Sequence, residues 1–475
     1  MIIGVEAKED SLMISYYDVN GNIAYMNKRL APHEVFNWEE GDKPSIEKNW
    51  DGKFLKKTKS KAQWLSRTRI EELILEKLTP VEIQTIYNFE NYPKISYTDI
   101  EIKLTDTTFP YPEKAAMPVG MISFCNEEGV SYVLSIMDSE KHPNGLSQEE
   151  ISKMEKEVCK YFTDIEPLKE SDKKLFNIDF KIKYKHFNSE KELMEFYFHQ
   201  IVPKQALITG WNFIDFDWQY LMVRSKKIGI DPLDKLPSRK TFSKRYKQPT
   251  HLGIIDYMAF MQDPGYKPYK VVENFTLDYI AHRTLNTTKL KHPYKNMLEF
   301  QQDVYMFVMY NVLDNLLVKL IEDKLGLLEV AFAFANVAQI ELNKIFSPVH
   351  ITEVLMSREL LKNNKHMMKK PYSSDEVEDT KYAGAWVMPP IPGYYKYISC
   401  YDFKSMYPNI AMQYNTSPDS YLGKKGMIKE DGTEIITKNN TLFSSKFDSV
   451  TRVILERLYN ARIEAQAEIS DLKYN

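Results

Sequence analysis

The chain has 475 residues, of which 43% are hydrophobic, and three cysteines that form no CxxC pair. This length exceeds what one hydrophobic core supports and predicts roughly two to four domains. So few cysteines argue against a disulfide scaffold or a zinc module. Together with a charged N-terminal decapeptide that lacks an apolar signal core, they indicate a reducing, cytoplasmic setting. No uncharged window reaches the about 20 apolar residues that a bilayer core requires, so no membrane segment is expected.

Charge is nearly balanced, with 63 Lys plus Arg against 66 Asp plus Glu and a net charge of -3, so the chain is not basic overall. Carboxylates gathered around a divalent metal would offset local basic patches in such a sum. Two basic segments occur, at residues 53–61 and at residues 235–247, and the second is interleaved with Phe242 and Tyr246. Cations beside aromatic rings suit single-stranded nucleic acid. A solvated loop is the better interpretation of the first segment, and both interpretations stay open for the second.

The hydrophobic pattern predicts a mixed α/β chain. Residues 12–17 and 22–26 alternate as strands do, and a helical stretch follows at residues 61–78. Residues 94–136 are strand-like, with turns at prolines. Helical periodicity then returns at three places: residues 147–162, 189–200 and 299–325. Strands that alternate with helices predict an α/β domain at about residues 95–327. A polar connector at residues 369–381 and an apolar strand at residues 396–403 indicate a further domain.

Two carboxylates stand on the first predicted strand of that domain. Asp99 and Glu101 are two residues apart, so on a strand both face one side while Ile100 and Ile102 face the core. Such a pair makes a platform for a divalent metal, although a surface strand of alternating charge remains the alternative. The same triplet recurs at residues 164–166, at the end of a helical stretch and before a proline. There we interpret Asp164 and Glu166 as solvated surface.

Two later segments carry further candidates. Asn212, Asp215 and Asp217 follow an apolar strand, and carboxylates this deep in an apolar stretch must be paired, hydrogen-bonded or metal-bound. A helix N-cap is the alternative, and it suits Asp215 better. Tyr310 and Asp314 are four residues apart on the predicted helix at residues 299–325 and therefore share a face. An ordinary Tyr–Asp hydrogen bond is the alternative for that pair.

In this order along the chain, the three elements resemble the DEDDy-type 3′–5′ exonuclease, and in particular the proofreading domain of family B DNA polymerases. The resemblance implies an RNase H-like exonuclease domain with two Mg²⁺ ions, which Mn²⁺ can replace. It implies four metal ligands: Asp99, Glu101, Asp217 and Asp314. It also implies that Tyr310 positions the attacking water and that Asn212 contacts DNA.

A fourth segment, KYISCYDFKSMYPNIAMQYNTSP at residues 396–418, resembles the polymerase motif DxxSLYPS. By this resemblance a strand delivers Asp402 to both catalytic metals and then turns into a helix. The backbone N–H groups of Ser405 and Met406 would bind the incoming triphosphate, as helix starts bind anions. Tyr407 would stack under the sugar and exclude a 2′-hydroxyl.

Upstream of that motif, residues 382–385 (YAGA) resemble the YxGG/A segment that guides the template, which makes Tyr382 and Gly384 candidate DNA contacts. Among family B enzymes, the replicative polymerases of T4-like phages are the group that the chain resembles most, and the resemblance covers nearly its whole length. It implies an N-terminal domain at residues 1–94, an exonuclease domain at 95–327, a return segment to the N-terminal domain at 328–376 and a partial palm domain at 377–475.

Two polymerase patterns, the KxxxNSxYG fingers helix and the DTD palm turn, do not occur in the sequence. Fingers, the rest of the palm and the thumb are therefore expected to be missing, so the chain would be one subunit of a split polymerase or a truncated one. We expect it to bind primer-template, single-stranded DNA and dNTPs and to need a second polymerase chain for synthesis. Two alternatives are a free-standing exonuclease and a non-catalytic nucleic-acid-binding subunit.

Overall fold

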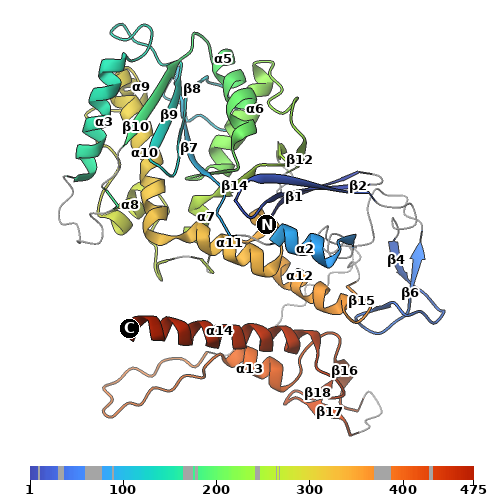
Figure 1. The fold of residues 1–475 in the computed structure, drawn as a ribbon. Helices are drawn as coiled ribbons and strands as arrows, with labels where there is room; N and C mark the ends of the chain where they lie inside the picture. Colours follow the sequence, from blue (N-terminus) through green and yellow to red (C-terminus); the bar gives the residue numbers. More distant parts are fainter. Residues whose placement is uncertain are drawn as a thin grey trace. The chain divides into compact units, whose positions relative to one another are not determined.

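The computed structural model describes residues 1–8, 11–29, 37–58, 77–87, 90–163, 175–176, 180–240, 247–263, 265–266, 268–367, 387–426 and 432–474. They form two compact units, one of residues 1–30 with 78–351 and one of residues 31–77 with 352–475 (Figure 1). The N-terminal segment is thus divided between the two units. The four domain boundaries drawn from the sequence stay a prediction.

A six-stranded mixed sheet forms the centre of the first unit, in the order β10-β9-β8-β7-β11-β14. Its strands are β7 (Ile95–Ile102), β8 (Val119–Cys125), β9 (Val130–Ser135), β10 (Lys181–His186), β11 (Leu207–Gly210) and β14 (Gly253–Asp256). β8 runs antiparallel to both of its neighbours, and the other neighbouring strands are parallel. The strand-like pattern of residues 94–136 is confirmed, and β7 lies inside the sheet between β8 and β11.

Helices cover both faces of this sheet. α3 (Gln148–Thr163) and α10 (Val304–Leu325) lie on one side, and α5 (Glu190–Phe196) and α6 (Gln219–Lys227) lie on the other (Figure 1). A π-helical turn, η2 (Tyr197–Ile201), and a 3₁₀ turn, η3 (Val202–Lys204), continue α5. A second π-helical turn, η4 (Ile214–Trp218), leads directly into α6. These helices confirm the periodicity predicted at residues 147–162 and 189–200.

The helix predicted at residues 299–325 is interrupted. α9 (Met297–Phe300) ends first, and α10 begins at Val304 because the Asp303 side chain accepts the Met306 N–H at 3.2 Å and caps the new helix. By length and hydropathy alone, α10 meets the criterion for a membrane-spanning helix, but 83% of its apolar window is buried inside the fold. Its composition is therefore that of a helix packed on all sides.

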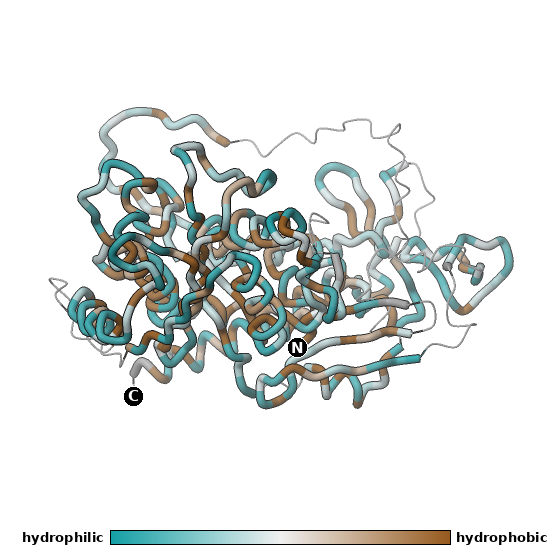
Figure 2. The backbone as a smooth tube through the Cα atoms, turned by 90° about the horizontal axis from the view of Figure 1, so that it is seen from above, coloured by the Kyte–Doolittle hydropathy of each residue, from teal (hydrophilic) through white to brown (hydrophobic). Residues whose placement is uncertain are grey.

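One hydrophobic core cluster lies between the sheet and the α5/α6 side, and the buried residues of α10 pack on the other face. Ile100 and Ile102 of β7 belong to a buried cluster that includes Trp218 and Leu221. The predicted inward direction of these two isoleucines is therefore confirmed, and Asp99 and Glu101 face the α10 side. Along the backbone, hydrophobic and hydrophilic residues alternate over short distances (Figure 2), as expected for elements that bury one face.

A second sheet joins the edge of the central one. β1 (Ile2–Lys8), β2 (Ser11–Tyr17) and β3 (Ile23–Arg29) are antiparallel, which confirms the strands predicted at residues 12–17 and 22–26. The Ser15 hydroxyl donates to the Thr250 carbonyl at 2.6 Å, and the Tyr17 hydroxyl donates to the Ala206 carbonyl at 2.8 Å. These bonds fix the N-terminal strands beside β11 and β14.

The remaining described elements of the first unit are α2 (Pro80–Tyr87), α7 (Tyr257–Gln262), α8 (Leu277–Leu285), α11 (Leu327–Ala338), the 3₁₀ turn η5 (Leu342–Lys344) and an antiparallel hairpin of β12 (Ser238–Lys240) with β13 (Lys247–Pro249). β12 and the first residue of β13 belong to the basic segment at residues 235–247. Phe242 and Tyr246, the aromatic residues of that segment, lie outside the described residues.

The second unit contains short sheets and two longer helices. α12 (Pro348–Leu361) enters it, and β15 (Lys365–His366) then pairs in parallel with β5 (Lys48–Asn49). β4 (Asn37–Glu40) pairs with β6 (Leu55–Thr58). The other elements are α13 (Met406–Gln413), β16 (Tyr421–Lys424), β17 (Glu434–Ile436), β18 (Thr441–Ser444) and α14 (Val450–Tyr474).

Two sequence expectations differ from the structure in this unit. The solvated loop expected at residues 53–61 contains β6 at residues 55–58, although Lys53, Lys56 and Lys57 are exposed as expected and residues 59–61 lie outside the described residues. The apolar strand expected at residues 396–403 is absent: residues 387–405 are irregular, and Tyr397 is 100% exposed. A strand requires a hydrogen-bonded neighbour, and no described residues pair with this segment. The predicted helix at residues 61–78 lies outside the described residues, apart from its last two positions.

Candidate active site

The acidic residues of β7 meet a carboxylate of α10. α10 packs on β7 and β8, and ligand oxygens of Asp99, Glu101 and Asp314 lie within 4.8 Å of one another. In the part of the chain that the structure describes, this is the one group of His, Cys, Asp or Glu side chains arranged closely enough to hold a metal ion. The two-residue spacing on a strand and the helical position of Asp314 therefore converge, as the sequence predicts.

A lysine that the sequence analysis did not select completes the group. Lys289 follows α8, and its Nζ lies 2.5 Å from Oδ2 of Asp314 and 4.5 Å from the ring centroid of Tyr310. The Asp278 carboxylate accepts the Lys289 backbone N–H at 2.7 Å and so fixes this turn. No spacing pattern distinguishes Lys289 from the neighbouring lysines, so only the fold identifies it. Tyr310 lies on the same face of α10 as Asp314, as predicted.

A buried carboxylate oxygen of the site has no hydrogen-bond partner among the described residues. Asn311 donates from Nδ2 to Oδ2 of Asp99 at 2.5 Å, and Lys289 engages Oδ2 of Asp314. Oδ1 of Asp314 is buried and accepts no hydrogen bond from any described residue. An unpartnered carboxylate oxygen in a buried site is costly. A cation is the partner that three converging carboxylates would accept, so these residues fit a divalent metal ion.

Burial of these carboxylates beside one another raises their pKa values. Desolvation and, to a lesser extent, the nearby Asp314 charge raise the pKa of Asp99 to about 7, although Lys289 and Asn311 oppose the rise. Desolvation likewise raises the pKa of Asp314 to about 6 against the opposing effect of Lys289. The pKa of Glu101 is well above its ordinary value for the same reason, with Asp99 as the next cause. Divalent cations would favour the charged forms of all three groups.

Asp217, the fourth predicted ligand, lies next to this group and is not part of it. It is 4% exposed, and its Oδ1 accepts the Ile100 backbone N–H at 3.0 Å. Burial raises the pKa of Asp217 well above its ordinary value, and the charge of Asp99 adds to the rise. Asp217 is therefore within electrostatic range of Asp99, and its role as a metal ligand stays a prediction.

The N-cap interpretation of Asp215 is wrong. Asp215 is exposed, and η4 has no side-chain cap. The acceptor is Asp256 at the end of β14, which takes the backbone N–H groups of Asn212 at 3.1 Å, Ile214 at 3.3 Å and Met258 at 3.0 Å. Asn212 has a φ of +58°, a turn conformation that asparagine tolerates. Asp256 stands between an apolar strand and a helix, which is an N-cap pattern that the sequence analysis did not use.

The polymerase-like motif is only partly formed. α13 begins at Met406 as the motif predicts, and Ser405 before it has a left-handed φ of +52°. Asp402 is exposed and lies on no strand, and Tyr407 is exposed as well. Their polymerase roles stay a prediction, as do those of Ser405 and Met406. Tyr382 and Gly384 lie outside the described residues, and so do Asp164 and Glu166.

The fold and the site together define a class: a mixed α/β domain with an acidic centre of the kind that binds divalent cations, consistent with the RNase H-like fold. Residues 22–252 match DNA polymerase family B, exonuclease domain, and residues 345–473 match DNA polymerase family B. The chain therefore belongs to DNA polymerase family B.

Three relatives illustrate the range of similarity. The chain is 27% identical over 447 residues to the DNA-directed DNA polymerase of Escherichia phage RB69, across 88% of this chain and 47% of that protein. It is 22% identical over 449 residues to that of Enterobacteria phage T4, across 89% and 47%. It is 26% identical over 317 residues to the DNA polymerase delta catalytic subunit of Plasmodium falciparum, across 61% and 29%. The chain spans about half the length of the two phage relatives.

Proposed function

We propose that this chain removes nucleotides from the 3′ end of DNA in a reaction that depends on divalent metal, as a proofreading exonuclease does. The observation that carries the proposal is the convergence of Asp99, Glu101 and Asp314 within 4.8 Å, with one buried carboxylate oxygen lacking a partner. The membership of the chain in DNA polymerase family B, with residues 22–252 matching its exonuclease domain, supports the same activity.

Two Mg²⁺ ions, or Mn²⁺ in their place, would be held by Asp99, Glu101, Asp314 and Asp217. When bound, such ions supply a nucleophilic hydroxide at neutral pH and stabilise the leaving oxygen of a phosphodiester. The Asp217 oxygen that accepts the Ile100 N–H at 3.0 Å is fixed by β7, the strand that also carries Asp99 and Glu101. Each carboxylate adds negative charge, which is what hard divalent cations require of their ligands.

The remaining site residues set charge and orientation. Lys289 lies against Asp314 at 2.5 Å and therefore limits the rise of the carboxylate pKa values. The Tyr310 phenol shares the α10 face with Asp314 and would orient the attacking water by a hydrogen bond. Positioning of this kind contributes to catalysis without changing the number of metal ligands.

Aromatic side chains on the connection that follows β7 suit a single-stranded substrate. Phe109 follows β7 and is 58% exposed, and its ring contacts Tyr111 at 5.1 Å and Phe216 at 6.0 Å between centroids. Exposed aromatic rings stack on bases of any sequence. We place the 3′-terminal bases of a frayed strand against Phe109, with Asn212 as a further DNA contact.

For DNA synthesis we propose that the second unit supplies part of a palm. Asp402 would bind catalytic metal, Ser405 and Met406 would bind the triphosphate of a dNTP, and Tyr407 would select the sugar. Tyr382 and Gly384 would guide the template strand of a primer-template. Because the chain spans 47% of its phage relatives, synthesis would need the complementary segments, supplied by a second polymerase chain or by a longer one.

A nuclease assay tests the exonuclease proposal. The purified chain, given a 5′-labelled single-stranded DNA and Mg²⁺, should produce a ladder that shortens from the 3′ end, and excess EDTA should stop it. An RNA strand of the same sequence tests whether the enzyme prefers DNA. A non-catalytic nucleic-acid-binding subunit would bind the strand and leave it intact, which would refute the proposal. If the chain degrades the strand but gives no DNA synthesis when mixed with a complementary polymerase fragment, a free-standing exonuclease would be favoured.

A further inference from the structure

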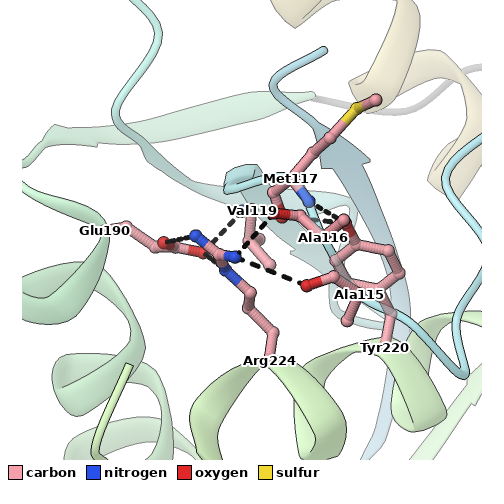
Figure 3. A network of polar contacts seen from close by, with 7 residues as sticks. All are labelled: Ala115, Ala116, Met117, Val119, Glu190, Tyr220 and Arg224. Carbon is pink, nitrogen blue, oxygen red and sulfur yellow. Dashed lines mark hydrogen bonds and ion pairs between the residues drawn. The ribbon is translucent and has the colours of Figure 1, made fainter. Parts of the chain in front are cut away.

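A mostly buried ion pair, with side chains that are 13% and 11% exposed, holds the segment that leads into β8 from the α5/α6 side of the sheet. Arg224 of α6 meets Glu190 of α5 with two parallel contacts, Nε to Oε1 at 2.8 Å and Nη2 to Oε2 at 2.7 Å (Figure 3). The third guanidinium nitrogen donates to the Ala116 carbonyl at 2.9 Å, and Oε1 of Glu190 accepts the Val119 N–H at 2.7 Å. Each member of the ion pair therefore also binds a backbone group of the segment before β8 or at its start.

Tyr220, one turn before Arg224 on α6, adds a third attachment to the same segment. Its hydroxyl donates to the Met117 carbonyl at 2.8 Å and accepts the Met117 N–H at 3.2 Å (Figure 3). We call Glu190, Tyr220 and Arg224 the brace. A buried ion pair is weak support for stability as such, because apolar residues of similar size often stabilise as well. What the brace does provide is a fixed position for residues 115–119.

These residues end the connection between β7 and β8, which begins beside the acidic centre. The Lys103 N–H donates to the Pro118 carbonyl at 2.9 Å and closes the base of the connection two residues after Glu101. Phe109 lies within it, exposed, and packs on Phe216, whose ring lies 6.1 Å from that of Tyr220. The brace thus contacts the connection in two ways. It forms hydrogen bonds with the backbone of the connection, and the Tyr220 ring reaches Phe109 through the ring of Phe216.

Asp217 stands on the same stretch of helix. Asp217, Tyr220 and Arg224 follow one another at intervals of three and four residues and so share one face of the helical segment formed by η4 and α6. A shift of this segment would move the brace and Asp217 together. The position of Phe109 is therefore tied to the helix that carries a candidate metal ligand.

We propose that the brace positions the β7–β8 connection so that Phe109 meets the 3′ end of a single strand at the acidic centre. Glu190, Tyr220 and Arg224 are positioning residues in this proposal and contact neither metal nor DNA. The proposal rests on the proposed exonuclease function and adds a determinant of how tightly the strand is held.

The test is a double-mutant cycle on the full chain. Arg224→Gln, Phe109→Ala and the combination of the two are compared for KM and kcat on a 5′-labelled oligonucleotide, and for its Kd by anisotropy with Ca²⁺ in place of Mg²⁺. Lys28→Gln, which breaks an ion pair with Glu82 on α2 in the same unit, is the matched control. Arg224→Lys keeps the positive charge and loses the bidentate contact with Glu190. It replaces Arg224→Gln in the cycle if the Gln variant does not fold.

We expect each single variant to raise KM and Kd by about tenfold, the effect of losing one base-stacking contact, while kcat and the Mg²⁺ concentration for half-maximal rate stay unchanged. The combination should be no worse than either single variant, because both remove the same contact. Additive effects, or a fall in kcat alone, would overturn the positioning role. Wild-type binding without hydrolysis would overturn the proposed function, and the cycle in Kd would still decide this inference. A wild-type chain that binds no oligonucleotide would overturn both.

Discussion

Lys289 lies with its ammonium group 2.5 Å from Oδ2 of Asp314, so the acidic centre contains its own monovalent cation. This contact leaves Oδ1 of Asp314 without a partner among the described residues. The lysine therefore neutralises part of the carboxylate charge and does not occupy every oxygen. A centre built in this way keeps three carboxylates together and still has negative charge for divalent ions.

Replacing Lys289 with methionine should lower the exonuclease rate by about 100-fold, the loss typical of removing one preorganised charged group from an active site. The side chain keeps its length and loses its charge, so the surrounding packing is little changed. Rates on single-stranded DNA at saturating Mg²⁺ measure the effect. Lys291→Met, two residues away and exposed, is the control and should leave the rate unchanged. Equal losses in both variants would show that Lys289 has no specific role.

Alanine in place of both Asp99 and Glu101 should abolish the exonuclease activity, because two of the three converging ligands are lost. Stability should change little, since the variant removes two carboxylates whose burial and mutual repulsion raise their pKa values. Nuclease assays and thermal unfolding check the two outcomes. The second copy of the triplet supplies the control: Asp164→Asn with Glu166→Gln should leave the rate intact. Full activity in the Asp99/Glu101 variant would refute the site.

Tyr310→Phe should slow the reaction less than loss of a carboxylate does, by roughly 10- to 100-fold, because orientation of water is lost while both metals remain. The half-saturating Mg²⁺ concentration should stay the same, since the phenol is not a metal ligand in this proposal. Asp314→Asn is the comparison, and it should raise that concentration. A large rise for Tyr310→Phe would mean that the phenol helps to bind metal.

The raised carboxylate pKa values predict how stability depends on pH in the absence of metal. Folded-state pKa values of about 7 for Asp99 and about 6 for Asp314 exceed the ordinary value of about 4. The folded protein therefore binds more protons than the unfolded chain over this range. The stability that protonation contributes is fully present below about pH 4 and is lost as the pH rises through 6 to 7.

Urea unfolding in EDTA at about pH 5.5 and about pH 8 measures this effect, and the wild-type chain should be less stable at the higher pH. Asp99→Asn with Asp314→Asn isolates the contribution, because that variant should lose most of the difference. Mn²⁺ at the higher pH should restore the stability of the wild type and not that of the variant. An identical pH dependence in both proteins would show that these carboxylates are not strained.

The centre was predictable where residue spacing carries the information. Period two on β7 and period four on α10 placed Asp99, Glu101, Tyr310 and Asp314 on the correct faces before any fold was known. Lys289 was not predictable, since its contact with Asp314 depends on how a turn after α8 packs against α10. Asp256 was available to sequence reasoning as an N-cap, because its capping partner Met258 is two residues away, whereas its contacts with Asn212 and Ile214 span more than 40 residues and depend on the fold.

The expected palm strand failed for a different reason. An apolar run at residues 396–403 satisfies local strand propensity, yet a strand forms only where neighbours accept its hydrogen bonds. In the described part of the chain no such neighbour is present, and Tyr397, Tyr401 and Phe403 are exposed. α13 formed at the predicted place because a helix satisfies its backbone internally.

Primer extension tests the role of that segment. Alone, the chain should add no nucleotides to a primer, because Asp402 is exposed and no second carboxylate joins it among the described residues. A catalytic metal pair requires ligands from both sides. Extension by the isolated, uncontaminated chain would show that the palm site is complete without further segments.

Mixed with a fragment that carries fingers, the rest of the palm and the thumb, the chain should extend a primer, because the partner's strands would give residues 396–403 the hydrogen-bonded neighbours that they lack. In that mixture Asp402→Ala should abolish extension and spare digestion of the 3′ end, while Asp217→Ala should do the reverse, since the two metal sites use separate ligands. Extension and digestion are measured on one labelled primer-template, with and without dNTPs. Loss of both activities in either variant would mean that the two sites are not independent, and the assignment of Asp402 and Asp217 to separate centres would be wrong.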